Sequence, residues 1–484
     1  MYSQENHIKT ASILIEKKKY NEAKFTLLEI IKDIKNIKID AKVYYLLFLS
    51  CDGLKESKNA KKYLEKCLKA NNKNHLVLNN LANIYLKEGN MYKAEKLYLR
   101  SLECKKDYLI AIANLAILYQ NLGKLEEAKK FYLKAINLSP KKIAIYFNLN
   151  RIDKHFIDKK KLEFLADLMK KEKIILSDMA YGFFLLAEYE RKQKNFNKEI
   201  EYLNNAHQNA FNFELSKNTQ TLKYWKNIIS KKYDKFKFKN DNTKNILTDF
   251  KPIFIIGLPR SGSTITEAVL SSGTKNITAL GETSIFNGII VKEFLNNEIS
   301  LIDVDLVRNK ILAVFDDRNY AIKNKVFIDK SLENFFYIDV ILKVFPKAKF
   351  INTFRNVEDN IFAIFQQSLS KLSWTHTIEN ILQYIDNYLK IMKYFTKKYP
   401  DKIFLLNLKE LTNKPEETSK NLYDFCDFKW NYRALDFYNR KDLLISTASN
   451  VQIRKKIENY DHDKYKPYKH LLKNFYAKYN WLNQ

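Results

Sequence analysis

The sequence lacks the features that would assign it to several large classes of proteins. No apolar run reaches the roughly 18 residues that a membrane-spanning helix requires. The opening segment, MYSQENHIKTASILIEKKKY, lacks the basic-then-apolar order of a secretory signal. No cysteine stands in a CxxC pair and the seven histidines are scattered, so no metal site is predicted. We therefore expect a cytoplasmic protein, with Cys51, Cys67 and Cys104 buried at repeat-like spacings as small core residues.

Arginine is scarce for so basic a chain. The formal net charge is +29, yet only ten of the 84 basic residues are arginine, and the lysines are spread along the whole sequence. A protein that binds a phosphate backbone would concentrate its charge and use more arginine. We therefore expect no nucleic-acid partner and mostly solvated lysine faces. A field that attracts an anionic ligand remains the alternative.

Length and composition predict more than one folded domain. A chain of 484 residues is too long for a single core. Hydrophobic residues make up 46% and aromatic residues 14% of it, which is ample for packed cores and argues against disorder.

An internal repeat organises the first half. Ala23, Ala60, Ala94 and Ala128 follow one another at spacings of 37, 34 and 34 residues. Around the last two, leucine-alanine, tyrosine, glycine, alanine and tyrosine recur in the same order. A period of 34 residues with small residues at these places resembles the tetratricopeptide repeat (TPR).

Residue size explains the repeated pattern. The small residues let the two helices of a unit approach closely, and Gly89 and Gly123 permit a left-handed turn between them. Stacked units then share one continuous core. The pattern is clearest over 41–142 and predicts a TPR array over 1–213, followed by a helix and polar linker over 214–250. The array either presents a partner or substrate in its groove or only supports the second domain.

From Lys251 onward the pattern of apolar residues becomes that of an α/β domain. Pro252–Ile256 is a continuous apolar run, typical of a buried parallel strand. It leads into the loop Gly257–Thr264 and then into an apolar-periodic segment, Ile265–Leu270. Strand, glycine-containing loop and helix form an arrangement that binds phosphate, because backbone N–H groups and the positive helix end converge on the anion.

The loop carries the spacing G-x4-G-S-T but not the lysine of a Walker A loop, whose place is taken by Ser263. An ordinary nucleotide triphosphatase or kinase is therefore disfavoured. The string P-R-S-G-S-T instead resembles the 5′-phosphosulfate loop of sulfotransferases that use 3′-phosphoadenosine-5′-phosphosulfate (PAPS).

Four further stretches resemble motifs of the same family, in the same order. Gly281–Thr283 resembles its G-E segment, and Asp329–Asn334 resembles its D-K-x-P-x-N motif. Phe345–Arg355 resembles the strand that ends in an arginine, and Thr447–Arg454 resembles a segment that closes over the cofactor. Together with the repeats, the chain resembles the TPR-containing bacterial sulfotransferases, which are related to protein-tyrosine sulfotransferases.

The resemblance implies roles for individual residues. Arg260 would cradle the 5′-phosphosulfate, Lys330 would stabilise the bridging oxygen, Arg355 would hold the 3′-phosphate, and Glu282 would be the base. This assignment suits sulfuryl transfer, an in-line displacement that needs positioning and positive charge. His376 is a rival base. The implied cofactor contacts are Pro259, Arg260, Ser261, Gly262, Ser263, Thr264, Arg355, Ser449 and Arg454.

The predicted architecture is an all-α TPR solenoid followed by a P-loop-like α/β sulfotransferase domain over 251–484, with a central parallel sheet. Its strands are expected at 252–257, 326–328, 348–354 and 402–408. The acceptor is a hydroxyl group of a protein, peptide, glycan or small molecule.

The sequence also departs from the family pattern. Leu332 and Val357 replace prolines, Gly273-Thr274 replaces a His-Pro pair, and Ala363 stands where a serine would join Arg355 on the 3′-phosphate. Losing one charge-assisted hydrogen bond costs about 1.5–3 kcal/mol of binding. The alternative function is therefore a TPR interaction scaffold with a degenerate sulfotransferase domain.

Overall fold

The computed structural model describes residues 2–31, 37–239, 247–274, 277–294, 301–317, 320, 325–440, 451–461 and 463–483. It separates into two units, Met1–Pro140 with Leu312–Tyr320, and Lys141–Ile311 with Ala321–Gln484. Each unit is described by itself.

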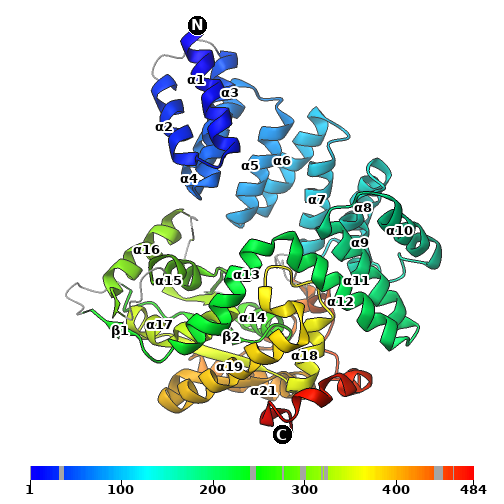
Figure 1. Ribbon diagram of the computed structural model, residues 1–484. Helices are drawn as coiled ribbons and strands as arrows, with labels where there is room; N and C mark the ends of the chain where they lie inside the picture. The colour runs from blue at the N-terminus through cyan, green and yellow to red at the C-terminus, as the bar shows by residue number, and fades with distance from the viewer. Residues whose placement is uncertain are drawn as a thin grey trace. The chain divides into compact units, whose positions relative to one another are not determined.

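The first unit is built from antiparallel helix pairs, each helix lying against the next along the chain (Figure 1). These pairs confirm the predicted helical repeats. The helices are α1 (Tyr2–Glu16), α2 (Tyr20–Ile31), α3 (Ile37–Gly53), α4 (Ser57–Ala70), α5 (His75–Lys87), α6 (Met91–Cys104), α7 (Leu109–Leu122) and α8 (Leu125–Leu138).

The repeated small residues lie where the helices meet. Ala82, Ala94 and Ala128 have no exposed surface. Gly89 and Gly123 both adopt a φ of 77°, so the left-handed turns predicted between paired helices are confirmed.

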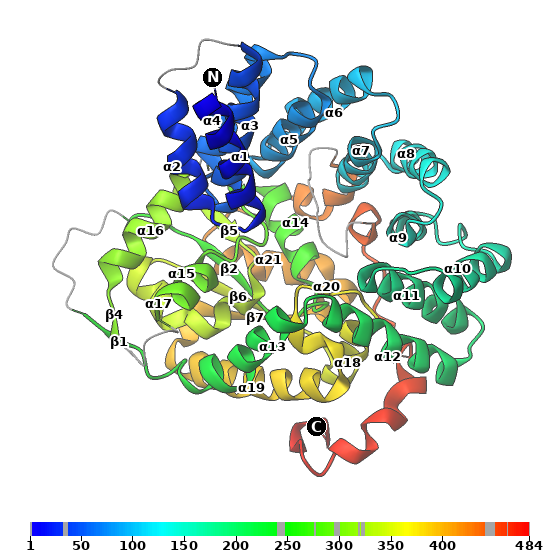
Figure 2. The same cartoon turned by 45° about the horizontal axis from the view of Figure 1, so that its top comes forward.

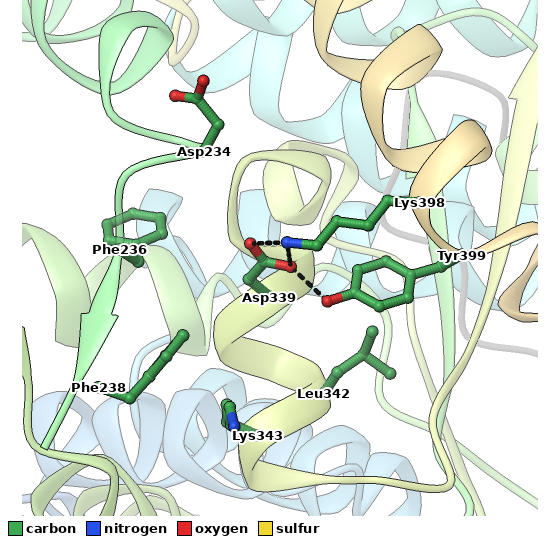
Figure 3. Close-up of a pocket in the computed structure, with 8 residues that line it drawn as sticks. All are labelled: Asp234, Phe236, Phe238, Asp339, Leu342, Lys343, Lys398 and Tyr399. Atoms are coloured by element: carbon green, nitrogen blue, oxygen red, sulfur yellow. Dashed lines mark hydrogen bonds and ion pairs between the residues drawn. The ribbon is translucent and has the colours of Figure 1, made fainter. Parts of the chain in front are cut away.

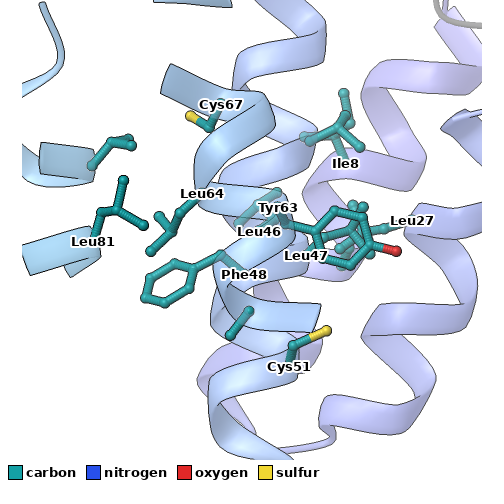
Figure 4. Close-up of a cluster of buried hydrophobic side chains, with 14 of the residues drawn as sticks. Ile8, Leu27, Leu46, Leu47, Phe48, Cys51, Tyr63, Leu64, Cys67 and Leu81 are labelled. Carbon is teal, nitrogen blue, oxygen red and sulfur yellow. The ribbon is translucent and has the colours of Figure 1, made fainter. Parts of the chain in front are cut away.

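The cysteine prediction is correct for two of the three repeat residues. Cys51 and Cys67 are buried in a cluster with Leu27 and Leu64 (Figure 4). Cys104 is exposed, and its predicted burial is wrong. It is the last residue of α6, beyond the turns that pack against the neighbouring helices.

The second unit begins with five helices that precede the sheet. They are α9 (Ile143–Ile152), α10 (Lys159–Lys171), α11 (Leu176–Lys192), α12 (Phe196–Phe213) and α13 (Leu215–Lys223). The chain then makes a π-helical turn, Tyr224–Ile228, and a 3-10 turn, Ile229–Lys231. Tyr224 and Trp225 are buried there, and Trp225 packs on Phe336 with ring centroids 5.3 Å apart. A short strand, β1 (Lys237–Phe238), pairs with β4 (Leu301–Ile302).

A five-stranded parallel sheet in the order β3-β5-β2-β6-β7 forms the centre of the second unit (Figure 2). The four predicted strands are confirmed with ends within one residue, whereas β3 was not predicted. The strands are β2 (Ile253–Gly257), β3 (Thr278–Ala279), β5 (Phe327–Asp329), β6 (Lys349–Phe354) and β7 (Ile403–Asn407).

Helices cover both faces of this sheet, so its central strands are apolar on both sides. On one face, Phe254 packs against Phe286, Phe327 and Phe350. On the other, Ile255 belongs to a core with α14 and α21. The helices of this part of the chain are α14 (Ser263–Gly273), α15 (Ile285–Phe294), α16 (Val304–Asp317), α17 (Ile338–Val344), α18 (Val357–Phe365), α19 (Ile378–Lys398), α20 (Leu408–Asn413) and α21 (Pro415–Phe425). Helix α16 runs from the second unit into the first, which includes the residues of this helix from Leu312 onward.

Helix α12 is tied to the sheet domain through a buried carboxylate. Glu199 has no exposed surface and accepts hydrogen bonds from Tyr468 Oη at 2.6 Å and Gln366 Nε2 at 3.1 Å. The third partner is Arg191, whose Nε lies 2.7 Å from Glu199 Oε1. A charge without access to water needs such a complete set of partners. The last TPR-like pair, α11 and α12, is therefore part of the same unit as the sheet.

Candidate active site

The predicted site residues gather at the carboxyl edge of the parallel sheet. The glycine-containing loop follows β2, Lys330 follows β5 directly, and Arg355 follows β6 directly. Glu282 lies in the segment after β3. Because parallel strands end at the same edge, residues far apart in the sequence meet there.

The loop after β2 has an unusual backbone. Arg260 and Gly262 have positive φ values of 67° and 98°, and Gly257 has one of 136°. A Cβ atom at Gly257 would lie 2.4 Å from Thr353 O, so only glycine fits between the two strands. Gly262 is the N-cap of α14 and brings no side-chain acceptor. The N–H groups of the first helical turn are thereby left to other partners, as anion binding requires.

Ser261 holds the loop against β6. Its hydroxyl donates to Leu258 O at 2.6 Å and lies 2.8 Å from Thr353 Oγ1. Asn360 of α18 fixes the other side, since its Nδ2 donates to Pro259 O at 2.8 Å. The Ser261 side chain is thus engaged inside the loop, while Ser263 and Thr264 open helix α14.

Lys330 is the centre of a buried charge cluster. Only 1% of its side chain is exposed, and its Nζ lies 3.0 Å from Glu282 Oε1 and 3.8 Å from Glu267 Oε2. Burial alone would lower the pKa of Lys330, but the two carboxylates outweigh it and hold the pKa above its ordinary value. The site therefore holds a charged ammonium group.

The two carboxylates around Lys330 differ in their surroundings. The Glu282 side chain is 55% exposed, whereas that of Glu267 is 16% exposed. Burial raises the pKa of Glu267 against the opposing effect of Lys330, and Glu267 Oε1 has no hydrogen-bond partner among the described residues. One ammonium group faces two carboxylates, and the nearer and more exposed of them is Glu282.

Asp329 shapes the turn that carries Lys330. It accepts hydrogen bonds from Thr283 Oγ1, from Ser331 N at 2.8 Å and from Asn334 Nδ2 at 3.3 Å. Burial raises the pKa of this carboxyl group, and its donors oppose the shift. These contacts join the segment after β3 to the segment after β5, and so bring Glu282 to Lys330.

Arg355 and Arg260 lie together on the other side of the loop. Arg355 Nη1 donates to Arg260 O at 3.4 Å, and its Nε and Nη2 donate to Tyr460 Oη at 3.0 and 2.8 Å. Arg260 Nη2 donates to Gln452 Oε1 at 3.1 Å. Arg454 lies two residues after Gln452 in the sequence, and its Nη1 donates to Arg440 O at 2.8 Å. Ser449 lies outside the described residues.

The departures from the family pattern have simple local consequences. Val357 is the first residue of α18, where a proline would also fit. Ala363 lies on the same helix and is 3% exposed. Its side chain is a methyl group, so it offers no hydroxyl to a phosphate. His376, the rival base, is 6% exposed and lies with its Nδ1 3.3 Å from His207 Nδ1.

Sequence reasoning did not identify Glu267 or Tyr460 as parts of the site, whereas Gln452 lies in the segment Thr447–Arg454 that resembles the family's closing segment. The one available signal was for Glu267, an acidic residue three positions after Thr264 and therefore one turn along the loop helix. Tyr460 reaches Arg355 through a tertiary contact that no local pattern marks.

The comparisons with known proteins agree with this arrangement. Residues 252–432 match the model of the Sulfotransferase family, and residues 41–74 and 74–141 match models of the tetratricopeptide repeat. The sulfotransferase model thus covers all five strands of the parallel sheet, and the repeat models cover helices α3 to α8.

A curated relative and several solved structures are similar to parts of the chain. An uncharacterized protein of Aquifex aeolicus (strain VF5) is 26% identical over 332 residues, which are 64% of this chain and 43% of that protein. The chain thus spans less than half of the relative's length. The sulfotransferase domain of the Synechococcus PCC 7002 olefin synthase is 17% identical and covers 48% of this chain and 91% of its own, with a TM-score of 0.33. Sulfotransferase STF9 from Mycobacterium avium is 12% identical and covers 66% and 94%, with a TM-score of 0.28.

A search for membrane-spanning helices adds one finding. Within the part of the chain that the structure describes, no helix combines the length and the hydropathy needed to cross a membrane.

Proposed function

We propose that the second unit transfers a sulfuryl group from PAPS to a hydroxyl group of an acceptor. The observation that carries the proposal is the meeting of three cations with a helix N-terminus at one sheet edge. Arg260 and Arg355 share a hydrogen bond, Lys330 lies among carboxylates, and Gly262 leaves the start of α14 without a side-chain cap.

The chemistry of these donors fits a ligand with two separate anionic groups. The first turn of α14 and Arg260 suit one phosphate-like group, because backbone N–H groups and a guanidinium both donate hydrogen bonds to phosphate oxygens. Arg355 suits the second, since its planar fork of N–H donors is held in place by Tyr460. The neighbouring residue Ala363 contributes no hydrogen bond to such a group.

PAPS, when bound, supplies an activated sulfuryl group and a leaving phosphate on which negative charge develops. Lys330 would balance that charge from its buried position, where a positive charge acts most strongly. Glu282 is exposed enough to accept the proton of the acceptor hydroxyl. Glu267 would keep Lys330 in place as Glu282 turns toward the acceptor.

Calorimetry with 3′,5′-adenosine bisphosphate, the product of PAPS, tests this proposal. Wild-type protein should bind it with micromolar affinity, and Arg260→Ala should abolish the binding. Arg433→Ala is the matched control, because Arg433 is an exposed arginine outside the loop. Tighter binding of ATP than of the bisphosphate would favour a kinase and overturn the proposal.

The second candidate is a TPR scaffold whose sulfotransferase domain has lost its cofactor, and Ala363 and Val357 favour it. Absence of bisphosphate binding to a folded wild-type chain would select this function. The leading proposal also includes a hydroxyl group as acceptor, a partner held by the repeats and a cytoplasmic location. Once binding of the bisphosphate is established, an acceptor screen tests the first of these.

A further inference from the structure

A pocket of about 610 Å³ opens in the first unit, between the second helices of two successive repeats. Helices α4 and α6 form its walls, and α5 lies beneath. It is lined by Glu65, Leu68, Lys69, Asn72, Leu81, Tyr85, Tyr92, Lys93, Lys96, Leu97 and Arg100.

The floor of this pocket is apolar. Leu81 is 3% exposed and belongs to the core of the repeats, and Leu68, Tyr85 and Leu97 are partly buried against that core. Tyr92 lies at the rim and is 76% exposed. The pocket can therefore hold an apolar side chain against its floor.

The walls carry four cations and one acid, and Lys93 Nζ lies over the ring of Tyr85, 5.1 Å from its centre. None of Lys69, Lys93, Lys96 and Arg100 forms an ion pair with a carboxylate of the described residues. The single acid, Glu65, instead accepts a hydrogen bond from Tyr85 Oη at 3.3 Å.

Other lysines of the same repeats do have carboxylate partners. Lys61 Nζ lies 2.6 Å from Glu88, and Lys24 Nζ lies 2.6 Å from Glu56. A second pocket, in the other unit, shows the same compensation: Lys398 Nζ lies 2.9 Å from both carboxylate oxygens of Asp339 (Figure 3). Unpaired cations in a hollow raise the local concentration of anions.

Arg100 distinguishes this pocket from the other lysine-rich surfaces of the repeats. It is the only arginine among the first 150 residues of the sequence. Its Nη2 donates to Asn72 O at 3.3 Å, which fixes one edge of the guanidinium. The other N–H groups form the fork that binds a carboxylate with two hydrogen bonds.

We propose that this pocket binds an acidic peptide segment, with an apolar side chain on the floor and flanking carboxylates on the four cations. A peptide fits better than a nucleic acid, because the cations surround one apolar hollow instead of following a long stripe. The site does not depend on the sulfotransferase function proposed above.

Fluorescence anisotropy of a labelled peptide on the full chain tests the proposal. The probe carries two glutamates, a leucine and two more glutamates, and a second probe has glycine in place of the leucine. The variant Lys96→Glu/Arg100→Glu should weaken binding of the first probe at least tenfold. The glycine probe should bind the wild type several-fold more weakly than the leucine probe.

The repeat supplies a matched control. Lys130→Glu/Lys134→Glu changes the same positions one repeat of 34 residues further on, and should alter binding less than twofold. Equal losses in both double variants would show general attraction to the basic chain and overturn the proposal. Competition by single-stranded RNA that exceeds competition by the unlabelled peptide would also overturn it.

Two further measurements keep the result interpretable. Circular dichroism checks that the variant folds, and Lys96→Gln/Arg100→Gln replaces it if charge reversal unfolds the repeats. Binding of 3′,5′-adenosine bisphosphate should be unchanged in the pocket variant, so a failure of the catalytic proposal is distinguished from a failure of this one.

Discussion

Arg355 donates two hydrogen bonds to a single oxygen, the phenol of Tyr460, at 3.0 and 2.8 Å. The same phenol donates to Asp359 Oδ2 at 2.5 Å. The edge of Arg355 formed by Nε and Nη2, which would hold the 3′-phosphate, is therefore already engaged by a side chain of the protein itself. A phosphate at Arg355 has to share or displace this phenol.

Tyr460→Phe is expected to strengthen the binding of 3′,5′-adenosine bisphosphate, because the phosphate no longer competes with the phenol. If displacing the phenol costs about 1 kcal/mol, affinity rises about fivefold. Titration calorimetry of wild type and variant measures the difference. Tyr465→Phe is the control, since the ring of Tyr465 lies 5.5 Å from the same guanidinium, and no hydrogen bond joins the two among the described residues. Weaker binding by Tyr460→Phe would show that the phenol orients Arg355 for the phosphate.

Lys330→Met is expected to lower both stability and cofactor binding. Without the ammonium, the buried Glu267 faces Glu282 with no counter-charge, which costs about 3 kcal/mol of the free energy of unfolding. Urea denaturation measures this loss. The double variant Lys330→Met/Glu267→Gln should recover most of the stability and none of the cofactor affinity. A double variant no more stable than Lys330→Met would refute the charge cluster as the cause.

Local sequence patterns predicted much of the fold. The alanine and glycine positions of the repeats depend on contacts within about 34 residues, and Gly89 adopts the turn expected of it. The buried parallel strands, such as Lys349–Phe354, are marked by continuous apolar runs, because both faces of the sheet are covered. The loop Gly257–Thr264 was found through its glycines and its place between strand and helix.

Contacts between residues far apart in the chain could not be predicted from the sequence. Tyr460 contacts Arg355 across 105 residues. Glu267 reaches Lys330 because α14 packs against β2 and β3, the strands on either side of β5. Cys104 follows the repeat spacing but lies on the last turn of α6, where the spacing no longer predicts burial. The roles of the site residues remain proposals, since periodicity and packing place side chains without showing what they bind.

Acid is expected to destabilise the second unit through two histidines. Burial lowers the pKa of His207 to about 3 and that of His376 to about 4, against an ordinary value near 6.5. Below pH 6.5 the unfolded chain binds protons that the folded chain does not. Stability therefore falls as the pH is lowered toward 4, by about 1.4 kcal/mol per pH unit and histidine.

Tryptophan fluorescence isolates this effect, because all four tryptophans lie in the second unit. The urea midpoint of the fluorescence change should fall between pH 6.5 and 4.5. His376→Phe should reduce the part of the pH dependence that the two buried histidines cause by about half, as one of them is removed. His155→Phe, which replaces an exposed histidine of the same unit, should leave it unchanged. If the urea midpoint of His376→Phe depends on pH as strongly as that of the wild type, His376 is not a source of the acid destabilisation.

Gly262→Ala tests the loop by its shape, without removing a charge. Gly262 has a φ of 98°, and an added Cβ would lie 2.8 Å from Leu408 Cδ1. Either the Leu408 side chain or the loop must shift, and a shift of the loop moves the N–H groups at the start of α14. Binding of 3′,5′-adenosine bisphosphate should weaken about tenfold, a loss of roughly 1.4 kcal/mol.

Two variants separate the steric cause from the backbone strain. Gly89→Ala also places a Cβ at positive φ, 77°, but nothing lies within 4 Å of it, so it should lower stability and leave bisphosphate affinity unchanged. Gly262→Ala/Leu408→Ala makes room for the new methyl group and should recover part of the affinity. If the double variant binds no better than Gly262→Ala, the loss arises from the backbone conformation of the loop alone, because the contact with Leu408 has been removed.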